Sequence, residues 1–217
     1  MNFGQIKQAA LNALAEQGTT PLVWTDPILS RGINEGQSMF ALLAGRPQGS
    51  TSLTLTPGRT MVPFPAGILQ VLELRIAGAL LSRGDIQALG AVHPSWMSDG
   101  PGTPRQWFPI GRFRCGLYPR PNAAYTLVVG GILQPANLVN ATDVPGLPVE
   151  DHEALVRYAI YYGLLMGGEA DLDRALGVYG VPDAKGAIPP GSFLHYVSKA
   201  MTDQGMLQAV LGAEIRR

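Results

Sequence analysis

The chain has 217 residues, with 16 basic and 16 acidic side chains. Charged residues make up 15% of the sequence, against roughly 25% in an average soluble protein. The zero net charge excludes a protein that is drawn as a whole onto nucleic acid or an anionic membrane. The shortage of charge favours a surface partly covered by permanent neighbours, and the alternative is a compact monomer rich in glycine and alanine.

A single cysteine, Cys115, excludes an internal disulfide framework and has no second cysteine at the spacing of a zinc site. This usage fits synthesis in a reducing cytosol. The first residues lack the pattern of a signal peptide, and no apolar run reaches the roughly 18 residues of a membrane span. The sequence therefore predicts a protein without a membrane partner.

Two helices are predicted at the start of the chain. Asn2 and Gln5 have the spacing of a capping box, and an apolar helical stripe follows them. Asp26, as the cap, and Pro27 predict the start of the second helix, because proline is favoured in a first helical turn. Gly45 then predicts its end.

The central part of the chain has the alternation of strands. The run "STSLTLTPGRTMVPFP" (residues 50–65) predicts a hairpin that turns at Pro57 and Gly58. Gly78 predicts a tight turn between two short strands, and Asp85 predicts the start of a short helix. The many prolines of the following segment favour short strands and edge strands over a central parallel sheet. Three more strands are predicted near residues 106–109, 113–118 and 125–129.

The last third of the chain returns to the helical period. Glu150, Asp151 and Glu153 place negative charge in the first turn of a helix whose apolar residues form two stripes, so it must be covered on two sides. A short helix over 171–178 and a longer one over 192–215 follow. The predicted fold class is α+β, with a helical bundle formed by the N- and C-terminal helices and a central antiparallel β region of short strands and hairpins.

The sequence contains no recognisable catalytic or metal-binding pattern. The three histidines, His93, His152 and His195, have no second ligand at metal spacing. The acidic run "GGEADLD" (167–173) lacks the closing glutamate of a calcium loop, and neither a nucleophile elbow nor a phosphate-binding glycine motif is present. We therefore predict no enzyme activity, no cofactor and no metal.

The stretch "TPRQWFPIGRFRCGLYPRPN" (103–122) combines aromatic residues with four arginines. Such a mixture could grip single-stranded nucleic acid by stacking. In a strand, however, Arg114 points away from Phe113 and Cys115, so that ring and cation need not share a face. The favoured alternative is a β hairpin whose arginines pair with carboxylates on a neighbouring protein.

Several motifs occur in a fixed order, namely "VPFP", "SWMSDGPGTPRQWF", "GLYPRP" and "LPVEDHEALVRYAIYYGLL". Over residues 20–180 this order resembles the head-to-tail adaptor (connector) proteins of tailed bacteriophages. Two glycines, at 130 and 131, stand where the family pattern has a tyrosine-bearing strand end. The resemblance implies a single adaptor domain over 1–217, divided into N-terminal helices (1–48), a β region that forms a docking surface (49–148) and C-terminal helices (149–217).

The resemblance also implies a structural ring, commonly of twelve copies, below the portal in the neck of the virion. Such a ring joins the DNA-filled capsid to the tail and lines the DNA channel, and its side contacts would cover the helix with two apolar stripes. The implied partners are further copies of the chain, the portal protein, tail or nozzle proteins, and double-stranded DNA that passes without sequence-specific binding. We expect synthesis in the cytoplasm of the host bacterium. The alternatives are a head-completion stopper, a tail terminator or a nucleic-acid-binding module.

The hairpin is then the expected docking surface, with aromatic residues as anchors and arginines as rim pairs. Trp107, Phe108 and Tyr118 are the expected anchors. The complete set of expected interface residues is Trp107, Phe108, Arg112, Arg114, Tyr118, Arg120, Tyr158 and Tyr162.

Overall fold

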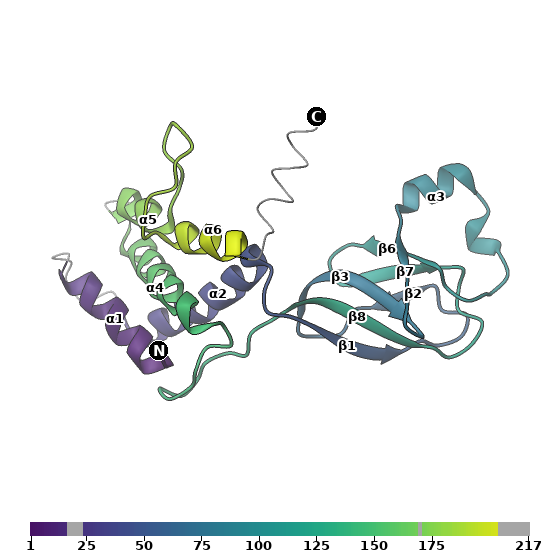
Figure 1. Cartoon of the computed structure of the whole chain (residues 1–217), viewed down its shortest axis with the longest axis horizontal. Helices are drawn as coiled ribbons and strands as arrows, with labels where there is room; N and C mark the ends of the chain where they lie inside the picture. Colours follow the sequence, from purple (N-terminus) through teal and green to yellow (C-terminus); the bar gives the residue numbers. More distant parts are fainter. Residues whose placement is uncertain (17–23, 169–170, 204–217) are drawn as a thin grey trace. The chain divides into compact units, whose positions relative to one another are not determined.

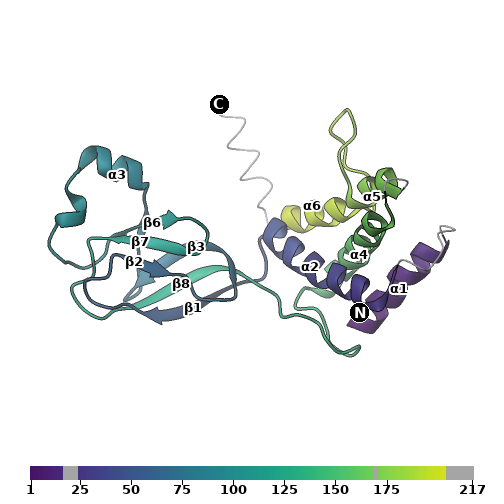
Figure 2. The same cartoon turned by 180° about the vertical axis from the view of Figure 1, so that it is seen from behind.

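The structure is a computed structural model and describes residues 1–16, 24–168 and 171–203. The chain divides into two compact units, a helical unit made of Met1–Pro47 and Gln134–Arg217, and a β unit made of Gln48–Leu133. Figures 1 and 2 show both units from opposite sides. The helices at both ends of the chain and the central strands confirm the predicted α+β class. The β region ends at Leu133 rather than at residue 148.

The helical unit contains five α-helices and one short 3₁₀ helix in its described residues. They are α1 (Phe3–Glu16), α2 (Asp26–Ala44), η2 (Val149–Asp151), α4 (His152–Gly167), α5 (Leu172–Tyr179) and α6 (Phe193–Asp203). Their buried side chains form one continuous core. The predicted end of the first helix at residue 18 and the part of the last predicted helix beyond 203 lie outside the described residues.

The predicted helix ends are present with one shift. The backbone N–H groups of Asn2 and Gln5 each donate to the other's side-chain oxygen at 2.9 Å, which confirms the capping box. The N-cap of α2 is Thr25, with Asp26 as the first helical residue, so the cap lies one residue earlier than predicted. Gly45 ends α2 in the left-handed conformation at φ 71°, as predicted.

Helix α4 is the central element of the helical unit. It packs against α1, α2, α5 and α6, and its buried residues face more than one side. The two apolar stripes of this helix are therefore covered by the chain's own helices. The expectation that ring neighbours cover them is wrong, because the sequence pattern shows that a face is apolar and does not show what covers it.

Two glycines set the close approach of α2 and α4. A Cβ atom at Gly32 would lie 3.0 Å from Cβ of Tyr162, and one at Gly36 would lie 3.0 Å from Cβ of Tyr158. Both pairs are spaced by four residues, so that two tyrosines of α4 lie over two glycines of α2. The Tyr158 hydroxyl also donates to Glu35 at 3.0 Å. Tyr158 and Tyr162 therefore stabilise the close packing of α2 against α4.

The β unit consists of two four-stranded sheets whose inner faces share one core. The strand orders are β1-β8-β3-β4 and β2-β7-β6-β5, antiparallel except for the short parallel pair β5–β6. The chain enters this unit on β1 and leaves it on β8, where Gln48 lies opposite Ile132. The strands are β1 (Gln48–Thr54), β2 (Met61–Pro63), β3 (Ile68–Ile76), β4 (Ala79–Leu80), β5 (Ser82–Arg83), β6 (Gln106–Ile110), β7 (Arg114–Tyr118) and β8 (Thr126–Leu133).

The predicted hairpin over 50–65 is wrong in its pairing. The turn at Pro57 and Gly58 is present, but β1 pairs with β8 and β2 pairs with β7, so the two strands belong to different sheets. The residues between them carry the chain from one sheet to the other, and Leu55 is buried in the shared core. By contrast, the predicted turn at Gly78 is confirmed, since β3 and β4 are joined through Ala77 and Gly78, both with positive φ.

The proline-rich strands are short, as predicted, but β6 and β7 are the two middle strands of their sheet rather than edges. Strand β5 pairs only with Gln106 and Trp107, so Pro109 lies on a part of β6 without an outer neighbour. A proline, which has no N–H to donate, is tolerated at such a position.

The glycine pair of β8 allows a close approach of β3. A Cβ atom at Gly131 would lie 2.2 Å from the carbonyl oxygen of Gln70, and one at Gly130 would lie 2.8 Å from Cγ of Glu73. The pairing of β3 with β8 also shifts its register along this stretch. The departure from the family pattern at 130 and 131 is thus part of the sheet geometry.

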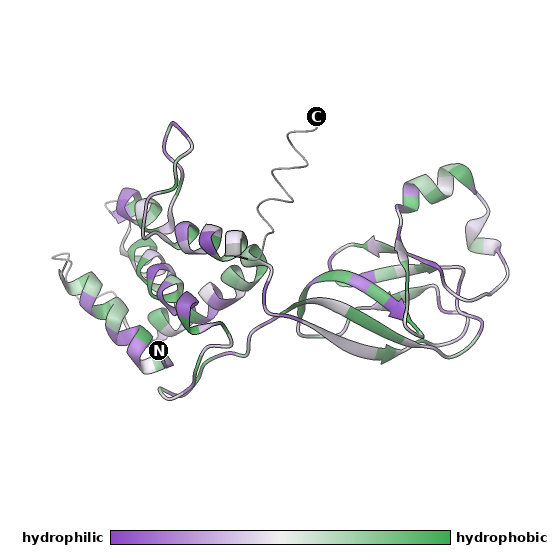
Figure 3. Ribbon diagram, viewed as in Figure 1, coloured by the Kyte–Doolittle hydropathy of each residue, from purple (hydrophilic) through white to green (hydrophobic). Residues whose placement is uncertain are grey.

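An arm leaves the strands of the β unit between β5 and β6. It begins with α3 (Ile86–Val92), where the Asp85 carboxylate accepts a backbone hydrogen bond from Gln87 at 2.6 Å, as the sequence predicts. No residue of α3 is buried, and apolar residues are visible along it in Figure 3. The arm returns through η1 (Trp96–Ser98), whose Trp96 ring packs edge-on against Phe108 with centroids 5.2 Å apart.

Candidate interaction surface

The tip of the β6–β7 hairpin presents one aromatic ring and two cations to solvent. Gly111 takes a left-handed φ of 62° in the turn, which places Phe113 outside the strand with 69% of its surface exposed. The Arg112 guanidinium lies over the Phe113 ring, 5.5 Å from its centroid, and Arg114 is exposed at the start of β7. The strand predicted over 113–118 begins one residue later, at Arg114, because the turn extends through residue 113.

The expected anchors Trp107 and Phe108 are buried within the β unit, with exposed fractions of 2% and 1%. Trp107 faces the shared core and contacts Phe64 edge-on, with ring centroids 6.4 Å apart. Phe108 faces the other side of the sheet, under Trp96. Tyr118 is half-buried. Trp107 and Phe108 therefore stabilise the hairpin by packing within the β unit, and the exposed side chains of the hairpin are Arg112, Phe113 and Arg114.

The packing around Phe108 depends on a glycine in the facing strand. A Cβ atom at Gly116 would lie 2.0 Å from a ring carbon of Phe108. The next residue toward the tip, Cys115, points into the core, where burial raises the pKa of its thiol to about 12. In the segment "RCGLY", packing therefore restricts the residue type on both faces of the sheet: Gly116 on the side of Phe108, and Cys115 on the side of the core.

Asp99 ties the arm to the hairpin. Its carboxylate Oδ2 accepts a hydrogen bond of 2.6 Å from the Tyr118 hydroxyl and lies 2.7 Å from Nε2 of His93. The bonds to Tyr118 and His93 lower the pKa of Asp99, and the same carboxylate raises the pKa of Tyr118. His93 thus takes part in holding the arm to the hairpin.

Three loops meet at the other end of the hairpin, and each carries an arginine. Beside Arg59, the backbone N–H of Gly58 donates to the carbonyl of Pro121 at 2.7 Å. The backbone N–H of Gly102 donates to the Arg120 carbonyl at 2.8 Å, and that of Arg105 donates to the Tyr118 carbonyl at 2.9 Å. The Nε atom of Arg120 is buried and has no hydrogen-bond partner. We refer to Arg59, Arg105 and Arg120 as the arginine end.

The β unit is strongly basic for its size. It has seven arginines and no lysine against three acidic residues, a net charge of +4. All three carboxylates are already engaged, since Glu73 pairs with Arg75 at 2.9 Å, Asp85 caps α3 and Asp99 holds the arm. The remaining six arginines form no ion pair with any described residue. They are Arg59, Arg83, Arg105, Arg112, Arg114 and Arg120.

The helical unit has the opposite balance, with nine basic and thirteen acidic residues and a net charge of −4. Two of its acids are paired with Lys7 and Arg46. Glu150 and Asp173 are exposed and form no ion pair with any residue in the described ranges. The net charge of the chain is therefore zero because the +4 of the β unit and the −4 of the helical unit cancel.

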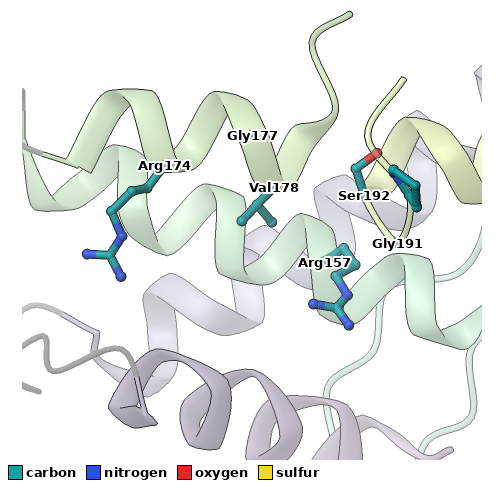
Figure 4. Close-up of a pocket in the computed structure, with 7 residues that line it drawn as sticks. Arg157, Arg174, Gly177, Val178, Gly191 and Ser192 are labelled. Atoms are coloured by element: carbon teal, nitrogen blue, oxygen red, sulfur yellow. The ribbon is translucent and has the colours of Figure 1, made fainter. Parts of the chain in front are cut away.

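A pocket of about 710 Å³ in the helical unit is lined by Arg157 of α4 and Arg174 of α5, which Figure 4 shows together with Ser192. Arg157 lies 3.1 Å from the Glu153 carboxylate, and Arg174 lies 2.9 Å from that of Asp171. Because both guanidinium groups have carboxylate partners, the pocket is locally neutral and offers no free cation for a ligand.

Among the residues that the structure describes, no group of three or more His, Cys, Asp or Glu side chains is placed to hold a metal ion. No helix in the described part of the chain combines the length and the apolar character needed to cross a membrane.

The eight expected interface residues thus divide by location. The exposed or half-buried ones are Arg112, Arg114, Tyr118 and Arg120. Trp107, Tyr158 and Tyr162 are buried in the two cores, and Phe108 is buried on the outer side of its sheet, under Trp96. Reasoning from the sequence missed Arg59 and Arg83, because only strand pairing brings them near the hairpin.

The β unit is thus a two-sheet unit inserted between helices, with six arginines that form no ion pair with any described residue. A family model described as SU10 adaptor protein matches residues 1–180, and a comparison with curated proteins found no match. The protein is a bacteriophage head–tail adaptor, a structural class rather than an enzyme class. The chain belongs to the SU10 adaptor protein family, which confirms the resemblance inferred from its motifs. Membership implies a place in the virion neck and association with other neck components.

Proposed function

We propose that the protein forms a ring of twelve copies below the portal, joins the DNA-filled capsid to the tail and lines the DNA channel. The match to the SU10 adaptor protein family over residues 1–180 carries this proposal. A ring uses heterologous contacts, in which one face of each copy meets a different face of the next. A chain with one basic and one acidic unit supplies two such unlike faces.

The tip of the β6–β7 hairpin is the proposed contact with the tail. Phe113 supplies an exposed ring, while Arg112 and Arg114 supply the charged rim that is typical of protein interfaces. Trp107 and Phe108 hold the hairpin in place from the interior. The helical unit is the proposed contact with the portal.

Complementation of a phage that lacks the gene tests this function. Loss of the protein is expected to leave DNA-filled heads without tails, and the double variant Arg112→Ala, Arg114→Ala is expected to reproduce that defect with a folded protein. Electron-microscopic class averages of the assembled ring count its copies. Twelve copies support the adaptor ring, six favour a stopper or terminator, and tailed particles without the protein refute a role in tail attachment.

The unpaired arginines of the β unit support a second candidate, a module that binds nucleic acid. This reading predicts micromolar binding of short oligonucleotides, lost in Arg112→Ala, Arg114→Ala, with steep salt dependence. The wall of a DNA channel must instead bind DNA weakly, because a protein that neutralises about 6 to 10 phosphates binds tightly and would impede passage of the genome. Absence of oligonucleotide binding at physiological salt therefore favours the ring.

A further inference from the structure

A cleft of about 800 Å³ lies within the β unit, between the arm and the end of the β6–β7 hairpin that is opposite its tip. Its lining comes from α3, from the return of the arm and from the two hairpin residues Gln106 and Tyr118. Clefts of roughly 300 to 1,000 Å³ are the usual size of binding sites in proteins. The cleft is therefore large enough to receive side chains of a partner.

Helix α3 supplies an apolar wall of this cleft. Leu89 and Val92 are three residues apart, so they lie on one face of the helix, and both line the cleft. No residue of α3 is buried, and Val92 has 87% of its surface exposed. A seven-residue helix is too short to be stable alone in water, because most helical stability in proteins comes from the packing of an apolar face. The apolar face of α3 thus lacks the cover that normally stabilises such a helix.

The same cleft contains a cation whose backbone is fixed on both sides. The N–H of Arg105, a member of the arginine end, donates to the Tyr118 carbonyl at 2.9 Å, and its carbonyl accepts from the N–H of Ser82 at 3.0 Å. The Arg105 side chain is exposed and forms no ion pair with any residue that the structure describes. The neighbouring Asp99 carboxylate is already bonded to His93 and Tyr118. Arg105 is therefore available to a carboxylate from another molecule.

The apolar wall and the cation together define the chemistry of a partner. An apolar side chain covers Leu89 and Val92, and a carboxylate close to it forms a charge-assisted hydrogen bond with Arg105. Nucleic acid fits this cleft poorly, because its binding depends on the neutralisation of several phosphates, whereas the described lining has one unpaired cation beside an apolar wall. A protein segment with an apolar residue beside Asp or Glu satisfies both features.

We propose that the cleft between the arm and the hairpin binds a segment of the tail protein that carries an apolar side chain beside a carboxylate. The proposal rests on the proposed function, because it extends the proposed tail contact from the hairpin tip along the same hairpin. Strand β6 has five residues, so the tip and the cleft are about 17 Å apart along the strand, within reach of one protein. This continuity favours the tail protein over a second copy of the chain.

Complementation of a phage that lacks the gene tests the cleft in the full chain. Val92→Asp places a carboxylate on the apolar wall, and Arg105→Glu reverses the charge of the cation. Each is expected to lower the yield of tailed particles about tenfold or more, because each sets a like charge against the carboxylate of the partner. Arg105→Lys keeps the cation and is expected to support tail attachment close to the wild-type level.

Two variants with the same changes of charge are the matched controls. Ala91→Asp lies on α3 and Arg59→Glu lies in the arginine end, and both change exposed residues that do not line the cleft. Both are expected to give wild-type yields, with circular dichroism of each purified variant as the check on folding. The proposal is overturned if either cleft variant supports tail attachment like the wild type, or if the controls lose it to the same extent.

Photo-crosslinking identifies the segment that occupies the cleft. The probe is p-benzoylphenylalanine in place of Val92, introduced into complemented tailed particles, and mass spectrometry locates the crosslinked peptide. We expect a peptide of the tail protein with Asp or Glu within a few residues of the crosslink, and we expect reversal of that carboxylate to Lys to restore tail attachment to the Arg105→Glu variant. A crosslink to DNA or to a second copy, a tail peptide without an acidic residue, or no crosslink in tailed particles overturns the proposal.

The failure of this proposal differs from the failure of the adaptor function. Tailed particles that assemble without the protein refute the adaptor function. Tailed particles that require the protein but assemble normally with Val92→Asp and with Arg105→Glu refute the cleft alone.

Discussion

Replacing Trp107 with alanine distinguishes a core residue from a docking anchor. The side chain is 2% exposed, contacts Phe64 in the shared core and has the Arg83 guanidinium 5.5 Å from its ring centroid. Removal of a buried tryptophan costs about 3 to 5 kcal/mol, which is a large part of the 5 to 15 kcal/mol that stabilises a typical domain. For a unit of this size, each kcal/mol lowers the melting temperature by roughly 4 to 8 °C. We therefore expect a decrease of at least about 12 °C.

Thermal and urea unfolding of the full chain measures this loss. Tryptophan fluorescence follows it, with Trp96 reporting on the β unit and Trp24 on the helical unit. Phe113→Ala is the matched control, because it removes an aromatic ring that is 69% exposed and is expected to change the free energy of unfolding by less than about 0.5 kcal/mol. A Trp107→Ala protein as stable as this control would refute the assignment of Trp107 to the core. It would restore Trp107 as a candidate anchor for a partner.

Three further predictions concern the same unit. Gly116→Ala is expected to lower the free energy of unfolding by about 1 to 3 kcal/mol or more, measured by urea denaturation, because the new Cβ meets the Phe108 ring at 2.0 Å. Cys115, with its pKa raised to about 12, is expected to resist a thiol reagent at pH 8 until denaturant is added. The lowered pKa of Asp99 means that its contacts stabilise the arm above the ordinary carboxyl pKa and are lost as pH falls through the lowered value. In a protein with Trp24→Phe, which leaves Trp96 and Trp107 as the fluorophores of the β unit, the fluorescence is therefore expected to change in acid, and Asp99→Asn is expected to reduce that change.

Controls for these predictions come from the same arm and sheet. Gly90→Ala in α3 adds a Cβ that meets no atom within 4 Å, so it is expected to leave stability unchanged or slightly higher. A Gly116→Ala protein with the stability of Gly90→Ala would contradict the packing argument. Rapid labelling of Cys115 in the folded protein would show that the core opens readily. An acid transition of equal size in Asp99→Asn would assign it to other groups.

The sequence predicts where helices, strands and turns lie better than it predicts which strands pair with each other. The capping box of Asn2 and Gln5, the start of α3 at Asp85 and the turn at Gly78 depend on interactions within a few residues, and all three are present. The partner of β1 is β8, more than seventy positions away at Gln48 and Ile132, and no local pattern indicates it. The apparent hairpin over residues 50–65 fails for this reason.

The candidate interaction surface was likewise predictable only in part. The basic and aromatic character of residues 103–122 is evident from the sequence, but strand alternation alone does not say which face is covered. The arm places Trp96 over Phe108 and buries a face that a single hairpin would expose. Arg59 joins Arg105 and Arg120 only through backbone bonds between distant loops. Which residues lie together on this surface therefore depends on the tertiary fold.

The pairing of β1 with β8 has a consequence for the history of the gene. Because Gln48 and Ile132 are opposite each other, the β unit starts and finishes at one place, as inserted domains do. A segment with such adjacent ends can be exchanged by recombination while the helices on either side keep their packing. Under the proposed function, exchange of this one continuous stretch of coding sequence would change the surface that meets the tail and leave the helical unit unchanged.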